Sequence, residues 1–358
     1  MPGTDTHARA VVFRGTERAF DLREFRVPEP EPGTVLLRME LCGICGTDVH
    51  YYQEGLRAPT ILGHENTGII AALGEGVETD SLGRPVRVGD RVVVQPGARG
   101  GAYGLRPLPE QDPRLTGGQA EHLYLNLPDT RFFKTDLPAE IAVLLEPFTV
   151  AIHAVERSRI RLGDTVVIQG SGAIGLMCLI AARLSGASKT IVIGGPAGRL
   201  GFAQRLGADQ VINIYEERDP ASRRERVLAE TPGRSGADVV IECAGVPSAI
   251  VEGIEMLRRG GMFCELGHFV DVGDMTLNPN RHMVWKDLNL VAPLGSRTEH
   301  FVRGLPIMEK HPELFAGMVS HRLPLTRVQE AFEALSGRYR LDGRDAIKIA
   351  IEPWQDRS

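Results

Sequence analysis

Sulfur, imidazole and carboxylate groups gather in two short stretches early in the chain. Cys42 and Cys45 form a C-x-x-C pair, and His64 is followed directly by Glu65. A C-x-x-C pair is typical of a zinc knuckle or of a redox pair. The chain has no second such pair, so a structural zinc site with four cysteine ligands is not expected. A thioredoxin-like pair should precede a helix in a βαβ unit, and this one lies in β-rich sequence. What remains is one Cys, one His and a carboxylate, the three-ligand set with an open position that catalytic zinc uses.

A glycine-rich motif at residues 170–175 predicts a phosphate-binding turn. It matches G-x-G-x-x-G and falls between an expected strand and an expected helix. In this motif one glycine allows the tight turn, the next lets the backbone approach a pyrophosphate, and the last lets the helix pack closely on the strand. The pyrophosphate would sit on the helix N-terminus. A Gly-rich turn without a ligand is the weaker alternative. The residues that would bind the dinucleotide here are Gly170, Gly172, Ala173, Ile174 and Gly175.

The type of dinucleotide stays open. The acidic residue that would bind the adenosine ribose is missing, because the second expected strand ends in glycines that include Gly195. Without a carboxylate to repel it, a 2′-phosphate could pair with Arg199, which favours NADP. Equally, Arg199 could be a charge on the helix surface, with NAD as the cofactor.

Gly245 and His268 follow two later strands, at the edge where open α/β sheets bind ligands. His268 would line the nicotinamide or substrate region, or it would be an ordinary loop histidine.

The elements expected around these motifs define an α/β protein with two kinds of architecture. The first third predicts short strands of a small barrel or sandwich, followed by a long loop over residues 95–118. After residue 150, strands alternate with helices, which indicates βαβ units and a doubly wound parallel sheet. The first-third strands are expected at 10–13, 34–41, 67–73 and 91–95; the later strands at 165–169, 190–194, 210–214, 238–242, 261–266, 288–293 and 345–352; and the helices at 173–184, 199–206, 248–259 and 328–335.

Length, charge and cysteine content narrow the possible classes of protein. A chain of 358 residues suggests two or three domains, and a net charge of −5 argues against a nucleic-acid partner. Five cysteines are too few and too irregular for a disulfide framework. We see no targeting segment, and the most apolar stretch, 166–184, is too interrupted for a membrane span. A cytoplasmic protein with no membrane association is expected.

Taken together, these motifs resemble the zinc-dependent medium-chain dehydrogenase/reductase family over almost the whole chain. The run from Gly63 through Gly68 to Gly74 and Val77 fits that family's zinc signature, and the segments 88–92 and 118–121 fit its pattern too. The resemblance implies a GroES-like, β-rich catalytic domain interrupted by a Rossmann domain. We expect the catalytic domain at 1–152 and 295–358 and the Rossmann domain at 153–294.

The resemblance also assigns roles to individual residues. Cys45 and His64 match the first two zinc ligands. Glu65 matches a carboxylate that coordinates the metal or lies just behind it, and Glu146 matches the third fixed ligand in the sorbitol and threonine dehydrogenase branch. Glu146 could instead be an acidic residue at a helix start beside Pro147. Three further matches are Asp48, which would orient His64, Thr47, which would contact the substrate oxygen, and His50, which would exchange the proton with solvent.

The other cysteines and His153 are expected to play structural roles. We expect Cys42 to be a buried thiol and His153 to pack or to form hydrogen bonds rather than to bind metal. Cys178, Cys243 and Cys264 fall within elements of the second architecture and are also expected to be buried thiols.

Two departures from the family limit what can be carried over. Residues 95–118 contain no Cys, so we expect one catalytic zinc and no structural zinc. Residues 51–62, which lie beside the substrate entrance in the family, form a shortened segment, so the identity of the substrate cannot be inferred from the family.

The resemblance implies a homo-oligomeric (dimeric or tetrameric) oxidoreductase that moves hydride between a secondary alcohol, such as a polyol, cyclitol or amino alcohol, and NAD or NADP. The alternatives are a zinc-independent quinone or enone reductase and a non-catalytic dinucleotide-binding protein.

Overall fold

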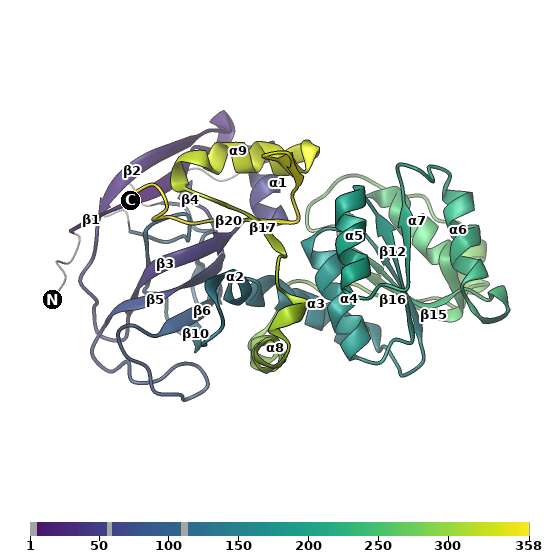
Figure 1. Ribbon diagram of the computed structural model, residues 1–358, viewed down its shortest axis with the longest axis horizontal. Coiled ribbons are helices and arrows are strands. Elements are labelled where there is room, and N and C mark those ends of the chain that lie inside the picture. The colour runs from purple at the N-terminus through teal and green to yellow at the C-terminus, as the bar shows by residue number, and fades with distance from the viewer. Residues whose placement is uncertain (1–5, 56–58, 109–113, 358) are drawn as a thin grey trace. The chain divides into compact units, whose positions relative to one another are not determined.

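The computed structural model describes residues 6–55, 59–108 and 114–357. The chain divides into two units, one made of Met1–Glu146 with Phe301–Ser358 and the other of Pro147–His300; Figure 1 labels their elements. The expected boundary at 152/153 falls inside α3 (Leu145–Ser158), and the one at 294/295 falls just before α8 (Thr298–Lys310). The expected catalytic domain, the shortened segment 51–62 and the long loop 95–118 include residues 1–5, 56–58 and 109–113, respectively. These residues lie outside the described part of the chain.

The unit built from both parts of the chain contains a seven-stranded sheet. Its order is β10-β6-β5-β3-β20-β17, with β9 also paired to β3, and a smaller sheet has the order β2-β1-β4. These sheets confirm the β-rich first architecture. The strands are β1 (His7–Phe13), β2 (Phe20–Arg26), β3 (Val35–Gly43), β4 (Thr60–Ile61), β5 (Glu65–Leu73), β6 (Arg91–Gln95), β9 (His122–Leu125), β10 (Arg131–Lys134), β17 (Val319–Leu323) and β20 (Lys348–Ile351).

Strand β20 joins the two sequence-distant parts of this unit. It pairs antiparallel with β3, where Ala350 faces Gly43 and Ile351 faces Cys42, and parallel with β17 on its other side. Residues that follow the second unit in the chain therefore lie against the strand that leads into the C-x-x-C pair.

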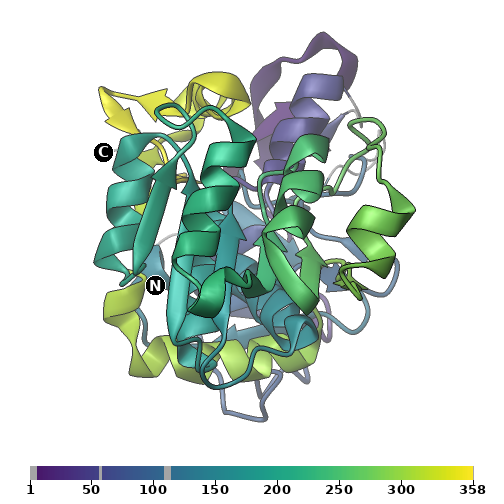
Figure 2. The same ribbon diagram turned by 90° about the vertical axis from the view of Figure 1, so that its right-hand side faces the viewer.

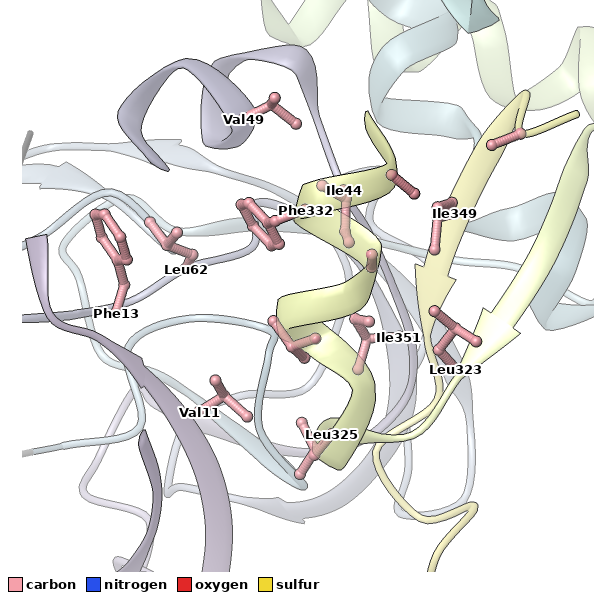
Figure 3. Packing of buried hydrophobic residues seen from close by; sticks show 14 of the residues in the cluster. Val11, Phe13, Ile44, Val49, Leu62, Leu323, Leu325, Phe332, Ile349 and Ile351 are labelled. Carbon is pink, nitrogen blue, oxygen red and sulfur yellow. The ribbon is translucent and has the colours of Figure 1, made fainter. Parts of the chain in front are cut away.

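A shared apolar core fixes this arrangement. Phe13, Ile44 and Leu62 pack with Phe332 and Ile351, and each of the five is at most 3% exposed. Figure 3 shows these side chains filling the space around the helix that carries Phe332. Complete burial of such a side chain contributes about 1.5–3 kcal/mol. The early and late segments of the chain thus hold each other in place.

The second unit is a parallel sheet of six strands in the order β13-β12-β11-β14-β15-β16. This is the order 3-2-1-4-5-6 of doubly wound dinucleotide-binding folds, so the expected fold class is confirmed. Figure 2 looks onto this unit and shows helices packed against its strands. The strands are β11 (Thr165–Gln169), β12 (Lys189–Gly194), β13 (Gln210–Asn213), β14 (Ala237–Glu242), β15 (Leu257–Glu265) and β16 (Asn289–Val291).

The expected helices are present, and several others accompany them. The apolar stretch from residue 166 is split between β11 and α4, and no helix in the described parts of the chain is long and apolar enough to cross a membrane. The expected helices are α4 (Ala173–Leu184), α5 (Ala197–Arg205), α7 (Pro247–Met256) and α9 (Val328–Glu333). Those not expected, besides α3 and α8, are α1 (Gly46–Glu54), α2 (Ala139–Ala142) and α6 (Pro220–Ala229).

The long loop at 95–118 is not wholly irregular. It contains a two-residue pair of strands, β7 (Gly97–Ala98) and β8 (Gly101–Ala102), which pair antiparallel. Tyr103 follows them and is fully buried, and its hydroxyl accepts from the N–H of Leu127 at 2.8 Å. One aromatic side chain therefore anchors the described part of this loop to the sheet.

Candidate active site

Cys45 lies at the junction between β3 and α1. It is the N-cap residue of the helix, and its N–H donates to Asp48 Oδ2 at 3.2 Å, so Asp48 closes a capping box around the first turn. Thr47 Oγ1 lies 3.6 Å from Cys45 Sγ. One helical turn therefore holds a thiol, a hydroxyl and a carboxylate in fixed positions.

Cys42 is a core thiol, as predicted. It is fully buried, and a Cβ on Gly63 would lie 2.3 Å from its Sγ. Burial raises the pKa of the Cys42 thiol well above its ordinary value, so the thiolate is disfavoured. A helix that was not expected follows the C-x-x-C pair, because α1 begins directly after Cys45. The pair is still not in a βαβ unit, since β3 pairs only with antiparallel neighbours.

His64 is paired with Asp48. His64 is 6% exposed, and its Nδ1 lies 3.3 Å from Asp48 Oδ1. Burial acts to lower the pKa of His64, but the charges of Asp48 and Cys45 raise it more, so the pKa lies well above its ordinary value. A carboxylate facing Nδ1 favours the tautomer with the proton there. Nε2 is then the nitrogen left to bind a metal.

Glu65 is paired with a lysine that the sequence analysis missed. Lys348 Nζ lies 2.7 and 2.8 Å from the two carboxylate oxygens of Glu65 and also donates to the carbonyl oxygen of Ile44 at 3.0 Å. Both side chains are buried, Glu65 at 1% and Lys348 at 6% exposure. The signal in the sequence is a single lysine inside the apolar run 346–351 of an expected strand.

Glu146 is a buried carboxyl in the first turn of α3. Burial raises its pKa to about 7; His64 and Lys348 act to lower it, while Glu65 and Asp48 raise it. These electrostatic neighbours are the groups described above, so Glu146 belongs to the same cluster. The helix dipole alone would lower the pKa of an acidic residue in a first turn, so burial outweighs it at Glu146.

The donor set fits a zinc ion, although the donors are not drawn tightly together. Thiolate, imidazole and carboxylate are the zinc ligands of proteins, and here each is buried or half-buried with a neighbour that orients it. Yet the only group of three potential ligands whose donor atoms lie within 4.8 Å of one another in the described ranges is elsewhere in the chain.

Two other histidines differ in their surroundings. His50 is half-buried on α1, three residues after Thr47, a spacing that places both on one side of the helix. His153 Nδ1 lies 2.8 Å from the carbonyl oxygen of Gly295, and its ring stacks on His300 with centroids 4.6 Å apart. His153 therefore packs and hydrogen-bonds, as predicted, rather than facing a metal site.

The glycine-rich turn has the geometry its sequence predicts. It connects β11 to α4, whose first residues are Ala173 and Ile174. Gly170 has φ +108°, which favours glycine, and a Cβ on Gly175 would lie 1.9 Å from the carbonyl oxygen of Gly170. At Gly172 the nearest atom to such a Cβ is 3.9 Å away, so only a ligand would require glycine there.

The end of β12 carries no carboxylate. A Cβ on Gly194 would lie 2.5 Å from Ser171 Oγ, and one on Gly195 would lie 2.5 Å from the ring of Tyr215. Arg199, on α5, is the side chain that lies 3.9 Å from the Gly172 position. Glycine is therefore the residue that fits at the end of β12. The guanidinium of Arg199 lies next to the glycine-rich turn.

Gly245 and His268 lie beside two carboxylates at the ends of β14 and β15. Gly245 has φ +69°, and its N–H donates to Glu242 Oε1 at 2.9 Å. His268 Nδ1 lies 2.8 Å from Glu265 Oε1 and 3.6 Å from Glu242 Oε2. The sequence analysis singled out Gly245 and His268 but neither glutamate, because each is a single polar residue at the end of an apolar strand.

Comparison with known families gives matches over both units. Residues 173–309 match the zinc-binding dehydrogenase family, and residues 31–135 match the alcohol dehydrogenase GroES-like domain. Sorbitol dehydrogenase of Bos taurus is 33% identical over 338 residues, which cover 87% of this chain and 88% of that protein.

Two solved structures have the same fold over nearly the whole chain. An alcohol dehydrogenase from Thermotoga maritima superposes with a TM-score of 0.88 at 28% identity and covers 98% of this chain and 100% of its own. The 2R,3R-butanediol dehydrogenase of Bacillus subtilis gives a TM-score of 0.77 at 28% identity and covers 97% and 99%.

Proposed function

The chain belongs to the zinc-binding dehydrogenase family with a GroES-like alcohol dehydrogenase domain, and from this we propose that it oxidises a secondary alcohol to a ketone, reversibly, with NAD or NADP. It is an oxidoreductase of the zinc-dependent alcohol and polyol dehydrogenase type. The observation that carries the proposal is the Cys45, Asp48 and His64 arrangement, in a chain whose other unit has a complete phosphate-binding turn. A polyol or vicinal diol fits the relatives, which include a sorbitol and a butanediol dehydrogenase.

Cys45, His64 and Glu146 are the proposed zinc ligands, with Glu65 lying behind them. The reason is that both oxygens of Glu65 accept from Lys348, whereas Glu146 is a buried carboxyl with a pKa of about 7. We also propose a single zinc site. The loop where the family carries a second, structural zinc has no cysteine in this sequence.

A zinc ion held by Cys45, His64 and Glu146 would supply a Lewis acid that makes the substrate hydroxyl more acidic, and a nicotinamide cofactor held at the glycine-rich turn would supply the hydride acceptor. The chain's residues do the rest. Asp48 fixes the His64 ring, so Nε2 points away from the carboxylate. Thr47 Oγ1, beside Cys45 Sγ, takes the proton from the substrate hydroxyl, and His50, half-exposed on the same helix, passes it to solvent. In the reverse direction the same two groups return the proton.

NADP is the proposed preferred cofactor. A carboxylate that bound the ribose hydroxyls would repel a 2′-phosphate, and β12 ends on Gly194 and Gly195 instead. Arg199 supplies a positive charge next to the glycine-rich turn, where a phosphate would pair with it. The dinucleotide contacts on the chain are proposed to be Gly170, Gly172, Ala173, Ile174, Gly175, Gly195, Arg199 and Gly245.

The domain organisation and assembly are also proposals. The unit of 1–146 with 301–358 would be the catalytic domain, and 147–300 the dinucleotide-binding domain. We propose a cytoplasmic homo-oligomer, a dimer or tetramer. Strand β16 is an edge strand, and large apolar side chains near it are exposed: Trp285 at 68%, Leu290 at 49% and Leu294 at 77%. Such a patch on a soluble enzyme is typical of a subunit interface.

The function is tested with the purified full chain, sorbitol and 2,3-butanediol as substrates, and either cofactor. Cys45→Ser should lose zinc and turnover while dinucleotide binding, followed by the fluorescence of NADPH, stays unchanged. Cys42→Ala is the matched control, since Cys42 belongs to the same C-x-x-C pair but lies in the core; it should keep both zinc and activity. Turnover by the Cys45→Ser protein, or by wild-type protein without zinc, would rule out the zinc mechanism and favour a zinc-independent reductase.

A further inference from the structure

Three potential metal ligands meet at one edge of the parallel sheet, in the dinucleotide-binding unit. Glu242 is the last residue of β14 and Glu265 the last of β15, and these neighbouring strands place the two residues side by side in register. His268 follows three residues after Glu265. One donor atom from each of the three lies within 4.8 Å of the other two, and no other such trio occurs in the described ranges.

One side chain points a buried, unpartnered oxygen at this cluster. The Glu242 side chain is fully buried, and its Oε2 has no hydrogen-bond partner, although its Oε1 accepts from the N–H groups of Ala244 and Gly245. This free oxygen lies 3.6 Å from His268 Nδ1. A buried carboxylate oxygen without a partner is costly, and a bound cation would satisfy it.

The backbone packs closely against the free oxygen of Glu242. A Cβ on Gly267 would lie 2.2 Å from Glu242 Oε2 and 2.4 Å from the N–H nitrogen of Gly245. Any side chain at position 267 would therefore displace this oxygen. Glycine at 267 and the αL conformation of Gly245 allow the two backbone segments to lie against the carboxylate.

Two carboxyl groups and an imidazole nitrogen face one another at this point. His268 Nδ1 lies 2.8 Å from Glu265 Oε1 and 3.6 Å from Glu242 Oε2, so this ring nitrogen faces both carboxyl groups. Burial and the neighbouring Glu265 carboxylate raise the pKa of Glu242 to about 8, as expected where two buried carboxyl groups lie close together. A cation bound among the three groups would offset this repulsion.

We propose that Glu242, Glu265 and His268 bind one divalent transition-metal ion in the dinucleotide-binding unit. Carboxylate oxygens suit Mn²⁺ and imidazole suits Zn²⁺, and a mixed set of two carboxylates with one imidazole accepts either ion. The site shares no residue with Cys45, His64, Glu65 and Glu146, so it is independent of the proposed catalytic zinc.

The probe is Mn²⁺, added to the full chain loaded with one zinc ion per chain and freed of excess zinc, and followed by the loss of the electron paramagnetic resonance signal of the free ion. Wild-type protein should bind one Mn²⁺ per chain. Cys45→Ser, which removes the catalytic zinc, should bind the same amount, so a failure of the proposed function would leave this result intact. Glu265→Gln and His268→Gln should each weaken Mn²⁺ binding about tenfold or more, because each removes a direct ligand, and loss of even an outlying partner of a ligand typically costs 10–100-fold.

The matched control is Glu255→Gln. Glu255 lies in the same unit and also faces a histidine, His282 Nε2 at 3.4 Å, but it is paired with Arg281. This variant should bind Mn²⁺ like wild type. Thermal unfolding and NADPH binding, measured on every variant, separate loss of the site from loss of the fold. Absence of Mn²⁺ binding by wild-type protein, or binding that survives both Glu265→Gln and His268→Gln, would overturn the proposal and leave a hydrogen-bonded trio that shares a proton.

Discussion

Lys348 Nζ lies 2.7 Å from one carboxylate oxygen of Glu65 and 2.8 Å from the other, in a place where both side chains are buried. The two residues come from strands β20 and β5, 283 positions apart in sequence. The pair lies beside the proposed zinc ligands. Because Lys348 holds the carboxylate of Glu65, the carboxylate left for the metal in our proposal is that of Glu146.

Lys348→Met should strongly destabilise the protein. The substitution leaves the Glu65 carboxylate buried without its counter-charge, which costs about 3–5 kcal/mol. Urea unfolding measured on the metal-free protein would show the loss. The double variant Glu65→Gln/Lys348→Met removes the charge as well and should regain most of the lost stability. A double variant as unstable as Lys348→Met would contradict the ion-pair account.

Asp48→Asn should weaken zinc binding about 10–100-fold, since the His64 ring loses the carboxylate that orients it. Competition with a coloured zinc chelator measures the affinity directly. Asp21→Asn is the control, because Asp21 pairs only with Arg14 and Arg23 among the contacts described, on β2. If Asp48→Asn bound zinc as tightly as wild type, the assigned role of Asp48 would be wrong.

Gly172→Ala should fold normally and yet bind NADPH about tenfold more weakly, a loss of about 1.4 kcal/mol. Nothing in the protein lies closer than 3.9 Å to the added Cβ, so the expected clash is with the pyrophosphate of the cofactor. Gly201→Ala, on α5 with open space around its Cβ, is the control and should bind NADPH normally. Fluorescence titration with NADPH and thermal unfolding check both variants. Equal affinity in the two would argue against the phosphate-binding role of the turn.

Arg199→Ala should lower kcat/KM with NADP about tenfold or more and leave kcat/KM with NAD nearly unchanged. A charge-assisted hydrogen bond to a phosphate contributes about 1.5–3 kcal/mol, and only NADP offers the 2′-phosphate. Arg205→Ala serves for comparison, since Arg205 stacks over Phe202 on the same helix. A parallel loss with both cofactors would show that Arg199 supports the fold or the pyrophosphate instead.

Asp80 gives a pH dependence of stability that is remote from the metal site. Its carboxylate accepts from the Arg84 side chain and from the N–H groups of Leu82, Arg84 and Lys134. Burial acts to raise the pKa of Asp80, but these donors, the Arg84 side chain foremost, lower it to a net value below its ordinary range. A carboxyl whose pKa is lowered on folding stabilises the protein above the unfolded pKa of about 3.9, and this contribution is lost as the pH falls below that value.

Asp80→Asn should therefore cost about 1–3 kcal/mol at pH 7, and its difference from wild type should shrink as the pH falls below about 4. Urea unfolding at a series of pH values measures both effects. Asp129→Asn, at an exposed turn, should follow the wild-type curve throughout. A constant difference between Asp80→Asn and wild type at every pH would exclude titration of Asp80 as the cause.

The phosphate-binding turn could be predicted from sequence because its signals are local. Val166–Ile168 form a purely apolar strand centre, the first glycine, Gly170, comes two residues later, and α4 begins and ends at the expected residues, Ala173 and Leu184. Strand ends elsewhere were off by a few residues, since Leu257 begins β15 by pairing with Ala237 of β14. Tertiary pairing of that kind is invisible in a single segment.

Two parts of the site could not be predicted for the same physical reason. Helix α1 begins at a cysteine N-cap and is rich in polar and aromatic residues, so it lacks the regular apolar stripe of an amphipathic helix; its Val49 and Tyr51 are buried by residues that come more than 250 positions later. The choice between Glu65 and Glu146 depends on Lys348, whose partner cannot be found from spacing. The residue types of the proposed ligands could be chosen from the sequence, whereas the side chains that contact them required the fold.

The position of β20 in the sheet sets an order of events during synthesis of the chain. The dinucleotide-binding unit is one continuous segment, so it can fold as soon as it leaves the ribosome. The metal-binding unit waits, because β3 and β17 cannot be joined, nor Glu65 neutralised, until the residues of β20 have emerged. With the proposed sites, a nascent chain would hold its nucleotide before its zinc, and a chain released early would bind cofactor without catalysing.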